Sequence, residues 1–289
     1  MAHPLPEAPL KDLLFVGFDT ETTGLSPLAC KLVELSAVKF RADGSVTATF
    51  SQLINPEASI PAEVTAIHGI TDSMVAGQPT YRQVVPEFAS WLESENTVLI
   101  AHNASFDLGF LEVAFARLRL PVPDYPVLDT LGLCRRFVRD VPNHQLKTLS
   151  EHLGLGSGGY HRALADSFHV KELLIHLLSI IAQCNTWEQL ANVSGVLQFN
   201  NLWTPTFTGT EKVPDGFELV NDAIATNRPL KLVYRNEHIL KRIVTPRSVH
   251  TWRGNLYLSA FCHTAQSERT YRLDKIISLR MAETQATHS

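Results

Sequence analysis

Residues 13–24 read Leu-Leu-Phe-Val-Gly-Phe-Asp-Thr-Glu-Thr-Thr-Gly, an apolar run followed by two acids. The apolar run Leu13–Phe18 predicts a short buried β-strand that ends at Asp19. Side chains alternate along a strand, so Asp19 and Glu21 point from the same face. An Asp-x-Glu pair by itself is more often a solvated strand end. Here the pair closes a core strand, where two converging carboxylates repel each other and a divalent cation would relieve the repulsion.

Two further acidic residues lie at comparable places. Asp107 follows the apolar strand candidate 98–101 and opens a predicted helix, although a helix N-terminus alone also favours an acid. His161 and Asp166 are five residues apart, which corresponds to about 140° around a helix, so both cannot be helical and face one point. We therefore place His161 on the glycine-rich loop and Asp166 inside the helix. A lone histidine before a helix is more often a surface residue, but its spacing from Asp166 favours a joint role.

Four carboxylates and a histidine on separate segments fit phosphodiester hydrolysis assisted by two divalent cations. Mg²⁺ and Mn²⁺ prefer oxygen ligands, and two cations about 3.5–4 Å apart stabilise the attacking and leaving oxygens together. A neutral histidine, with an ordinary pKa of about 6.5, can accept the proton of the attacking water. The predicted catalytic set is Asp19, Glu21, Asp107, His161 and Asp166.

These segments resemble the three exonuclease motifs of the DnaQ-like DEDDh 3′–5′ exonucleases, a family that includes the epsilon subunit of bacterial DNA polymerase III. The segments are Phe18–Gly24, then His102–Asp107, then His161 with Asp166, and the resemblance covers residues 12–183. Ile67–Thr71 also resembles the segment that these enzymes carry between their first two motifs. The resemblance implies an α/β fold, a ribonuclease H-like mixed sheet flanked by helices.

The resemblance also implies the roles of individual residues. The carboxylates of Asp19, Glu21, Asp107 and Asp166 would bind two Mg²⁺ or Mn²⁺ ions, and His161 would act as the general base. A pocket for the 3′-terminal nucleotide would be lined by Thr20, Thr22 and Leu25, with His68 and Phe106 nearby.

The rest of residues 12–183 reads as alternating strands and helices. Strand candidates 32–40 and 46–54 are joined by Asp43-Gly44, a strong hairpin signal. Further helices are predicted at 81–92, 106–118, 146–153 and 162–181, with short strands at 98–101 and 127–128. A three-strand meander followed by alternating helices and strands predicts a mixed sheet covered by helices.

Composition limits the compartment and the partners. The 289 residues carry a net charge of −4, which argues against a protein held to nucleic acid by bulk positive charge. The four cysteines have no zinc-site or disulfide-framework spacing, and we find no signal peptide or membrane-spanning run. We therefore expect a soluble cytoplasmic protein with no membrane partner.

A linker is predicted at 184–215, with a short helix near 187–193, and a second domain at 216–281. Residues 216–280 contain 11 basic and 5 acidic residues, so this small domain is basic and the remainder acidic. Its helix and short strands predict a small curled sheet or β-barrel. The segments 254–258 and 269–276 resemble a WYL domain, which implies an Sm-like barrel.

Arginine and tyrosine side chains on short strands suit phosphate pairing and base stacking. We expect Tyr257, Arg269 and Arg272 to contact nucleic acid or another ligand, against the alternative that the tyrosine fills the barrel and the arginines are solvated.

The expected function is a 3′–5′ exonuclease acting on nucleic acid, with DNA preferred over RNA and single-stranded DNA or 3′ overhangs as substrate. The alternative is a regulatory protein that senses a nucleotide or oligonucleotide through the barrel and uses the nuclease fold as scaffold. A protein partner or a homodimer stays open.

Overall fold

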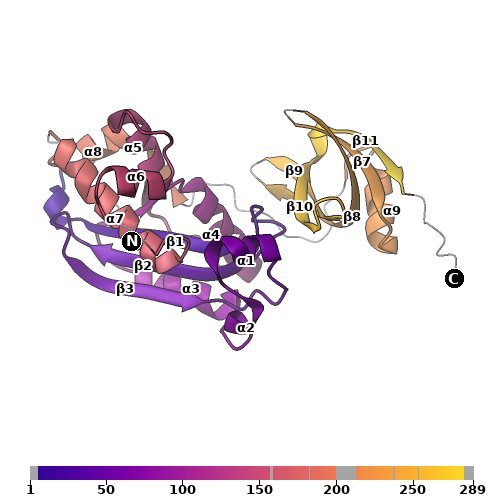
Figure 1. Cartoon of the computed structure of the whole chain (residues 1–289), viewed down its shortest axis with the longest axis horizontal. Coiled ribbons are helices and arrows are strands. Elements are labelled where there is room, and N and C mark those ends of the chain that lie inside the picture. The colour runs from indigo at the N-terminus through magenta and orange to yellow at the C-terminus, as the bar shows by residue number, and fades with distance from the viewer. Residues whose placement is uncertain are drawn as a thin grey trace. The chain divides into compact units, whose positions relative to one another are not determined.

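A computed structural model describes residues 6–156, 159–181, 183–199, 213–236, 238–252 and 254–282, without the side chain of residue 252. The chain divides into two compact units (Figure 1). The first is formed by Met1–Thr23 and Lys31–Leu202, and the second by Gly24–Cys30 and Trp203–Ser289. Within the described residues, no helix is both long and apolar enough to cross a membrane.

The first unit is built on a mixed sheet with the strand order β3-β2-β1-β4-β5-β6. β1, β2 and β3 form the predicted antiparallel meander, β4 and β5 run parallel to β1, and β6 returns antiparallel to β5. The strands are β1 (Leu14–Thr22), β2 (Leu32–Phe40), β3 (Val46–Leu53), β4 (Thr97–Ala101), β5 (Pro126–Asp129) and β6 (Val196–Gln198).

Helices cover both faces of this sheet. α7 packs on β1 and β2 together with α5 and α6, over an apolar cluster that includes Phe15 and Phe40. Phe18 faces the other way, toward the side where Phe50 of β3 contacts Phe88 of α3. The helices are α1 (Ala62–His68), α2 (Asp72–Val75), α3 (Tyr81–Leu92), α4 (Ser105–Leu118), α5 (Thr130–Phe137), α6 (Leu146–His152), α7 (Ala163–Ile180) and α8 (Trp187–Ser194), with a 3₁₀ turn at Leu10–Asp12.

The contact between α7 and β1 is unusually close at one position. A Cβ atom at Gly17 would lie 3.0 Å from the backbone oxygen of Ser167. Glycine at this strand position therefore lets the helix approach the sheet, which brings the start of α7 near the end of β1.

The second unit is an antiparallel sheet with the strand order β10-β9-β8-β7-β11 and one helix, α9 (Glu218–Thr226). α9 contributes Val220 and Ala223 to a core shared with the inward-facing residues of the strands. The strand pairings among the described residues leave β10 and β11 as edges, so the predicted barrel is not closed there. The remaining elements are β7 (Leu230–Arg235), β8 (Ile239–Trp252), β9 (Asn255–Cys262), β10 (Ser267–Arg272), a 3₁₀ turn (Leu273–Lys275) and β11 (Ile276–Met281).

Several elements escaped the sequence prediction. β1 continues through both predicted carboxylates to Thr22, because it stays paired with β2 beyond its apolar run. α1, α2, α5 and β6 were not predicted, since each is too short to show a clear hydrophobic period. α8 and β6 lie inside the predicted linker 184–215, yet both belong to the first unit, because β6 pairs with β5. Residues 200–212 of that linker lie outside the described residues.

Candidate metal centre and its surroundings

Three carboxylates converge at the end of β1. Asp19 and Glu21 leave the strand on the face covered by α7, and Asp166 comes from the first turn of that helix. Oxygen atoms of these three residues all lie within 4.8 Å of one another. The close contact at Gly17 is what allows helix and strand to present their acids to the same point.

Asp107 reaches the same strand from the opposite face. It lies in the first turn of α4 and is 3% exposed. Its Oδ1 accepts two hydrogen bonds from Thr20, one from the backbone N–H at 2.9 Å and one from the hydroxyl at 2.7 Å. One carboxylate oxygen therefore anchors α4 to β1, and Asp107 stands just outside the cluster of three.

The electrostatics of these acids show a strong mutual repulsion. Burial raises the pKa of Asp19 well above its ordinary value, and the charges of Asp107, Asp166, Glu21 and Glu34 raise it further. Burial, followed by the charges of Asp166 and Glu34, raises the pKa of Glu21 to about 8. Burial also raises the pKa of Asp107 to about 7 and increases the pKa of Asp166. Without a cation, the cluster therefore holds protons that isolated carboxylates would release.

A hard divalent cation fits this donor set. All the converging ligand atoms are carboxylate oxygens, which suit Mg²⁺ and Mn²⁺ rather than a softer metal. A bound cation would also offset the repulsion that raises the carboxylate pKa values. Asp19, Glu21 and Asp166 are the residues that would hold it, with Asp107 at the margin.

His161 lies beside the cluster on strained backbone. Its φ is +64°, a left-handed conformation that is uncommon for residues other than glycine. Its backbone N–H donates to Oδ2 of Asp166 at 2.9 Å, while its side chain is exposed. As predicted, His161 precedes the helix and Asp166 lies within it.

Two contacts hold the segment that carries His161. On one side, the ring of Tyr160 stacks on the buried His169 with centroids 4.4 Å apart. On the other, Arg162 is bound by Glu34 of β2, which is 2% exposed. His169 is thus part of the packing beside the site.

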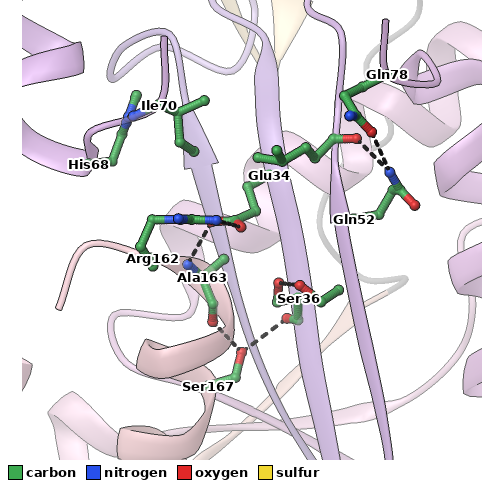
Figure 2. Close-up of polar contacts among 11 residues, drawn as sticks. Glu34, Ser36, Gln52, His68, Ile70, Gln78, Arg162, Ala163 and Ser167 are labelled. Carbon is green, nitrogen blue, oxygen red and sulfur yellow. Dashed lines mark hydrogen bonds and ion pairs between the residues drawn. The ribbon is translucent and has the colours of Figure 1, made fainter. Parts of the chain in front are cut away.

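Glu34 makes a fork with Arg162 and also fixes the start of α7 (Figure 2). Arg162 donates from Nη2 at 2.9 Å and from Nε at 3.2 Å, and the backbone N–H of Ala163 donates at 2.9 Å. One turn further on, the Ser167 hydroxyl donates to the carbonyl of Ser36 at 3.1 Å. We call Glu34, Arg162 and Ala163 the clasp. It ties the segment beside His161 to the strand that pairs with β1.

The comparisons with known proteins agree with this geometry. A family model described as exonuclease matches residues 16–174, which is more than half of the chain. The chain belongs to this exonuclease family. A second model, described as the WYL domain, matches residues 215–281. The first unit therefore contains a DnaQ-like exonuclease domain and the second a WYL domain, and the exonuclease family uses divalent metal ions.

The exonuclease domain is similar to part of PolC-type DNA polymerase III from two bacteria. The Halalkalibacterium halodurans protein is 40% identical over 174 residues, 60% of this chain and 12% of that protein. The Caldanaerobacter subterraneus protein is 33% identical over 200 residues, 69% of this chain and 14% of that protein. The chain thus spans only a small part of the length of these relatives.

Solved structures show the same ribonuclease H-like fold. An exonuclease I from Methylocaldum szegediense has a TM-score of 0.54 at 14% identity, covering 86% of this chain and 54% of that one. A 3′-exonuclease that recognises a histone mRNA stem-loop has a TM-score of 0.50 at 19% identity, covering 60% of this chain and 84% of that one.

The residues predicted to bind substrate differ in how far their side chains are exposed. Thr20 and Thr22 are buried, and the hydroxyl of Thr20 is engaged by Asp107. Leu25 is 76% exposed. Phe106 is half-buried and packs against Phe110, with ring centroids 5.2 Å apart.

His68 is buried and held in one orientation. Its Nδ1 accepts a hydrogen bond from the backbone N–H of Ile70 at 3.0 Å, so in the neutral ring the proton is on Nε2. Burial lowers its pKa, which favours that neutral form. Nε2 is buried and meets no acceptor at full hydrogen-bond geometry among the described residues, while an interaction with the Thr22 backbone partly offsets the effect of burial on the pKa of the ring.

The three predicted contact residues of the WYL domain lie on two faces of its sheet. Tyr257 and Arg272 are direct cross-strand partners and share one face of the sheet. Arg269 is paired with Ala260 on the other face, because three residues along a strand reverse the side-chain direction. Arg272 donates to Asp274 from Nε at 2.9 Å and from Nη2 at 2.5 Å.

Sequence reasoning missed Glu34 and Asp129. Glu34 is an acid inside an apolar strand, directly opposite Glu21 in the β1–β2 ladder. The pairing of β1 with β2 across the connection 23–31 places it there, and no turn signal in that connection indicated the register. Asp129 is the last residue of β5, just as Asp19 lies near the end of β1. Its Oδ1 accepts a hydrogen bond from the backbone N–H of Asn103 at 2.8 Å. β1 and β5 therefore each carry an acid at or near their carboxyl ends, which was a usable signal, whereas β4 ends at Ala101.

The raised carboxylate pKa values predict an unusual pH dependence of stability without metal. The folded protein binds more protons than the unfolded chain between the ordinary pKa of Glu21 and its raised value of about 8, so stability falls as the pH rises. We expect the free energy of unfolding in EDTA to fall by at least about 1 kcal/mol from pH 6.5 to 8.5. Urea unfolding measures it.

The controls separate this effect from other titrations. The buried His68 and His102 have lowered pKa values, so they make stability rise with pH, opposite in sign to the carboxylates, and their contribution fades above the ordinary histidine pKa of about 6.5. Saturating Mg²⁺ and the Glu21→Gln substitution should each flatten the profile. An equally steep profile in Glu21→Gln would show that the carboxylate cluster is not its source.

Proposed function

We propose that the protein is a metal-dependent 3′–5′ exonuclease of the DEDDh type that hydrolyses phosphodiester bonds from the 3′ end of nucleic acid. The observation that carries this proposal is the convergence of carboxylate oxygens from Asp19, Glu21 and Asp166 within 4.8 Å, with His161 next in the chain to the clasp. A cluster of this kind is costly to the fold and is explained by the cations that it would hold.

The mechanism follows from these residues. When bound, two Mg²⁺ or Mn²⁺ ions would neutralise the carboxylates and stabilise charge on the attacking and leaving oxygens. Asp19, Glu21, Asp107 and Asp166 would hold these ions. His161 accepts the proton of the attacking water, and its exposed ring can pass the proton on to solvent. The water oxygen bonds to phosphorus as the bond from phosphorus to the 3′-oxygen of the preceding nucleotide breaks, and that oxygen takes up a proton from solvent.

The pocket for the terminal nucleotide is proposed at the same strand end. His68 supplies a buried N–H donor, suited to an acceptor on the sugar or base. Thr22 supplies a small polar surface and Phe106 an apolar surface beside the terminal nucleotide.

We favour single-stranded DNA and 3′ overhangs as substrates, with the cytoplasm as compartment. The similar PolC-type proteins are DNA polymerases by name, whereas one solved relative of the fold recognises an mRNA stem-loop. The four cysteines are all free thiols, in keeping with a reducing compartment.

The test is the degradation of 5′-labelled single-stranded DNA, duplex DNA with 3′ overhangs and RNA, with Mg²⁺, Mn²⁺ or EDTA. We expect a ladder that shortens from the 3′ end with either metal and is absent in EDTA, with DNA degraded faster than RNA. Folded protein that yields no ladder on any strand with Mn²⁺ would refute the exonuclease proposal. The sensor alternative, with Tyr257 and Arg272 at a ligand face, would then be favoured.

A further inference from the structure

One face of the WYL domain presents basic side chains on three neighbouring strands. β11, β7 and β8 are paired so that Arg280 lies opposite Lys231, and Lys231 lies opposite Ile243. Two residues along, Val233 pairs with Lys241. The basic members are all exposed: Lys231, Arg235, Lys241 and Arg280. We call these four residues and the strand positions between them the basic face.

The basic face is the side of the sheet away from the core. Leu230 and Leu232 alternate with Lys231 and point into the core, where α9 adds Val220 and Ala223. Figure 1 shows α9 beside β7, β8 and β11. α9 packs on the core side, and no other helix among the described residues of this unit covers the opposite side of these strands.

The charges on the basic face are not balanced within the fold. Lys231 and Arg280 are direct cross-strand neighbours, an arrangement of like charges that destabilises a sheet. Among the residues that the structure describes, none of the four basic side chains has an ion-pair partner. An anionic ligand would supply the missing charge.

Apolar side chains lie among these charges. Ile239 is 65% exposed, Ile277 is 45% exposed and Ile243 is 42% exposed. Exposed isoleucines on a charged sheet suit a ligand that has apolar surface between its anionic groups, as sugars and bases do between phosphates.

We propose that the basic face binds the phosphodiester backbone of nucleic acid. The choice of nucleic acid rests on the proposed function, since a nuclease meets this polyanion as its substrate. Side chains two residues apart on a strand are separated by roughly 6.6–6.8 Å, so long basic side chains from three strands can contact several successive phosphates. This surface is distinct from the Tyr257–Arg272 pair, which lies on β9 and β10.

Binding is measured in EDTA, where it does not depend on catalysis. Fluorescence anisotropy of a labelled 30-nucleotide single strand is followed against salt for wild type and for Lys231→Gln/Lys241→Gln/Arg280→Gln. We expect the dissociation constant to rise at least about 10-fold at 50 mM salt, and the salt slope to fall by about 2, as expected for three lost phosphate contacts. Thermal unfolding should show a variant at least as stable as wild type, because a like-charge pair is removed.

The matched control removes three positive charges elsewhere in the same domain, by Arg228→Gln/Arg247→Gln/Lys275→Gln. Equal losses in both variants would show that net charge, rather than the basic face, attracts the strand, and would overturn the proposal. Wild-type affinity in the first variant, or binding of anionic vesicles in place of nucleic acid, would also overturn it. If wild type binds through this face yet cleaves nothing, the proposed exonuclease function fails while the basic face stands.

Discussion

Replacing Asp19 by Asn should abolish nearly all nuclease activity and, at the same time, stabilise the metal-free protein. We expect kcat to fall by at least about 10³-fold, because the centre loses several kcal/mol of charge stabilisation in the transition state. The stability of the protein in EDTA should rise, since Asp19 is repelled by four neighbouring carboxylates. A gain of about 1 kcal/mol would raise the Tm by roughly 2–4 °C.

The matched control is Asp43→Asn. Asp43 is an exposed aspartate in the β2–β3 turn that accepts hydrogen bonds from Ser45, far in the sequence from every ligand. The Asp43→Asn substitution should leave kcat unchanged and slightly lower the Tm, because the hydrogen bonds from Ser45 are weakened or lost. Steady-state cleavage and thermal unfolding in EDTA provide the two readouts. A less stable, inactive Asp19→Asn protein would contradict the assignment of Asp19 to a repulsive cation site.

The second large effect concerns His161 and the clasp that holds its segment. His161→Gln should lower kcat by about 10²–10⁴-fold, the usual contribution of a positioned general base. Glu34→Gln should lower kcat about 10–100-fold with a smaller change in KM, since a Gln amide cannot accept the fork from Arg162. Arg162→Lys keeps the charge, loses the fork and should resemble Glu34→Gln.

The double variant distinguishes positioning from general destabilisation. If the clasp acts through His161, Glu34→Gln should add little once His161 is already Gln. Glu57→Gln, which removes the exposed ion pair with Arg82, is the control and should leave kcat unchanged. Full additivity of Glu34→Gln and His161→Gln would show that Glu34 does not act through the histidine.

β1 was predictable because its local hydrophobic pattern is strong. An apolar run followed by two acids at strand spacing predicts both the strand and its carboxylates, and the structure brings Asp19 and Glu21 together with Asp166. The partnership of Glu34 with Arg162 was not predictable, because it joins residues 128 positions apart. Only the register of β1 and β2 shows that Glu34 stands opposite Glu21.

The placement of the C-terminal contact residues shows a different limit. Arg269 and Arg272 were each predicted to contact nucleic acid or another ligand, and they point to opposite faces of β10. Strand alternation alone would have separated Arg269 from Arg272 once both were assigned to a single strand. Barrel closure, in contrast, depends on pairing between distant strands, which no local pattern encodes.

Gly17 sets the distance between β1 and α7, the two elements that carry the carboxylate cluster. The backbone oxygen of Ser167 lies 3.0 Å from where a methyl group at this position would stand. Any side chain there would act as a spacer, pushing the helix that carries Asp166 away from the strand that carries Asp19 by a few tenths of an ångström or more. Two-cation chemistry tolerates little variation in the separation of its ligands, since the cations themselves must lie about 3.5–4 Å apart. A substitution at Gly17 would therefore lower the proposed activity by separating α7 from β1, although no residue that would bind metal or substrate is changed.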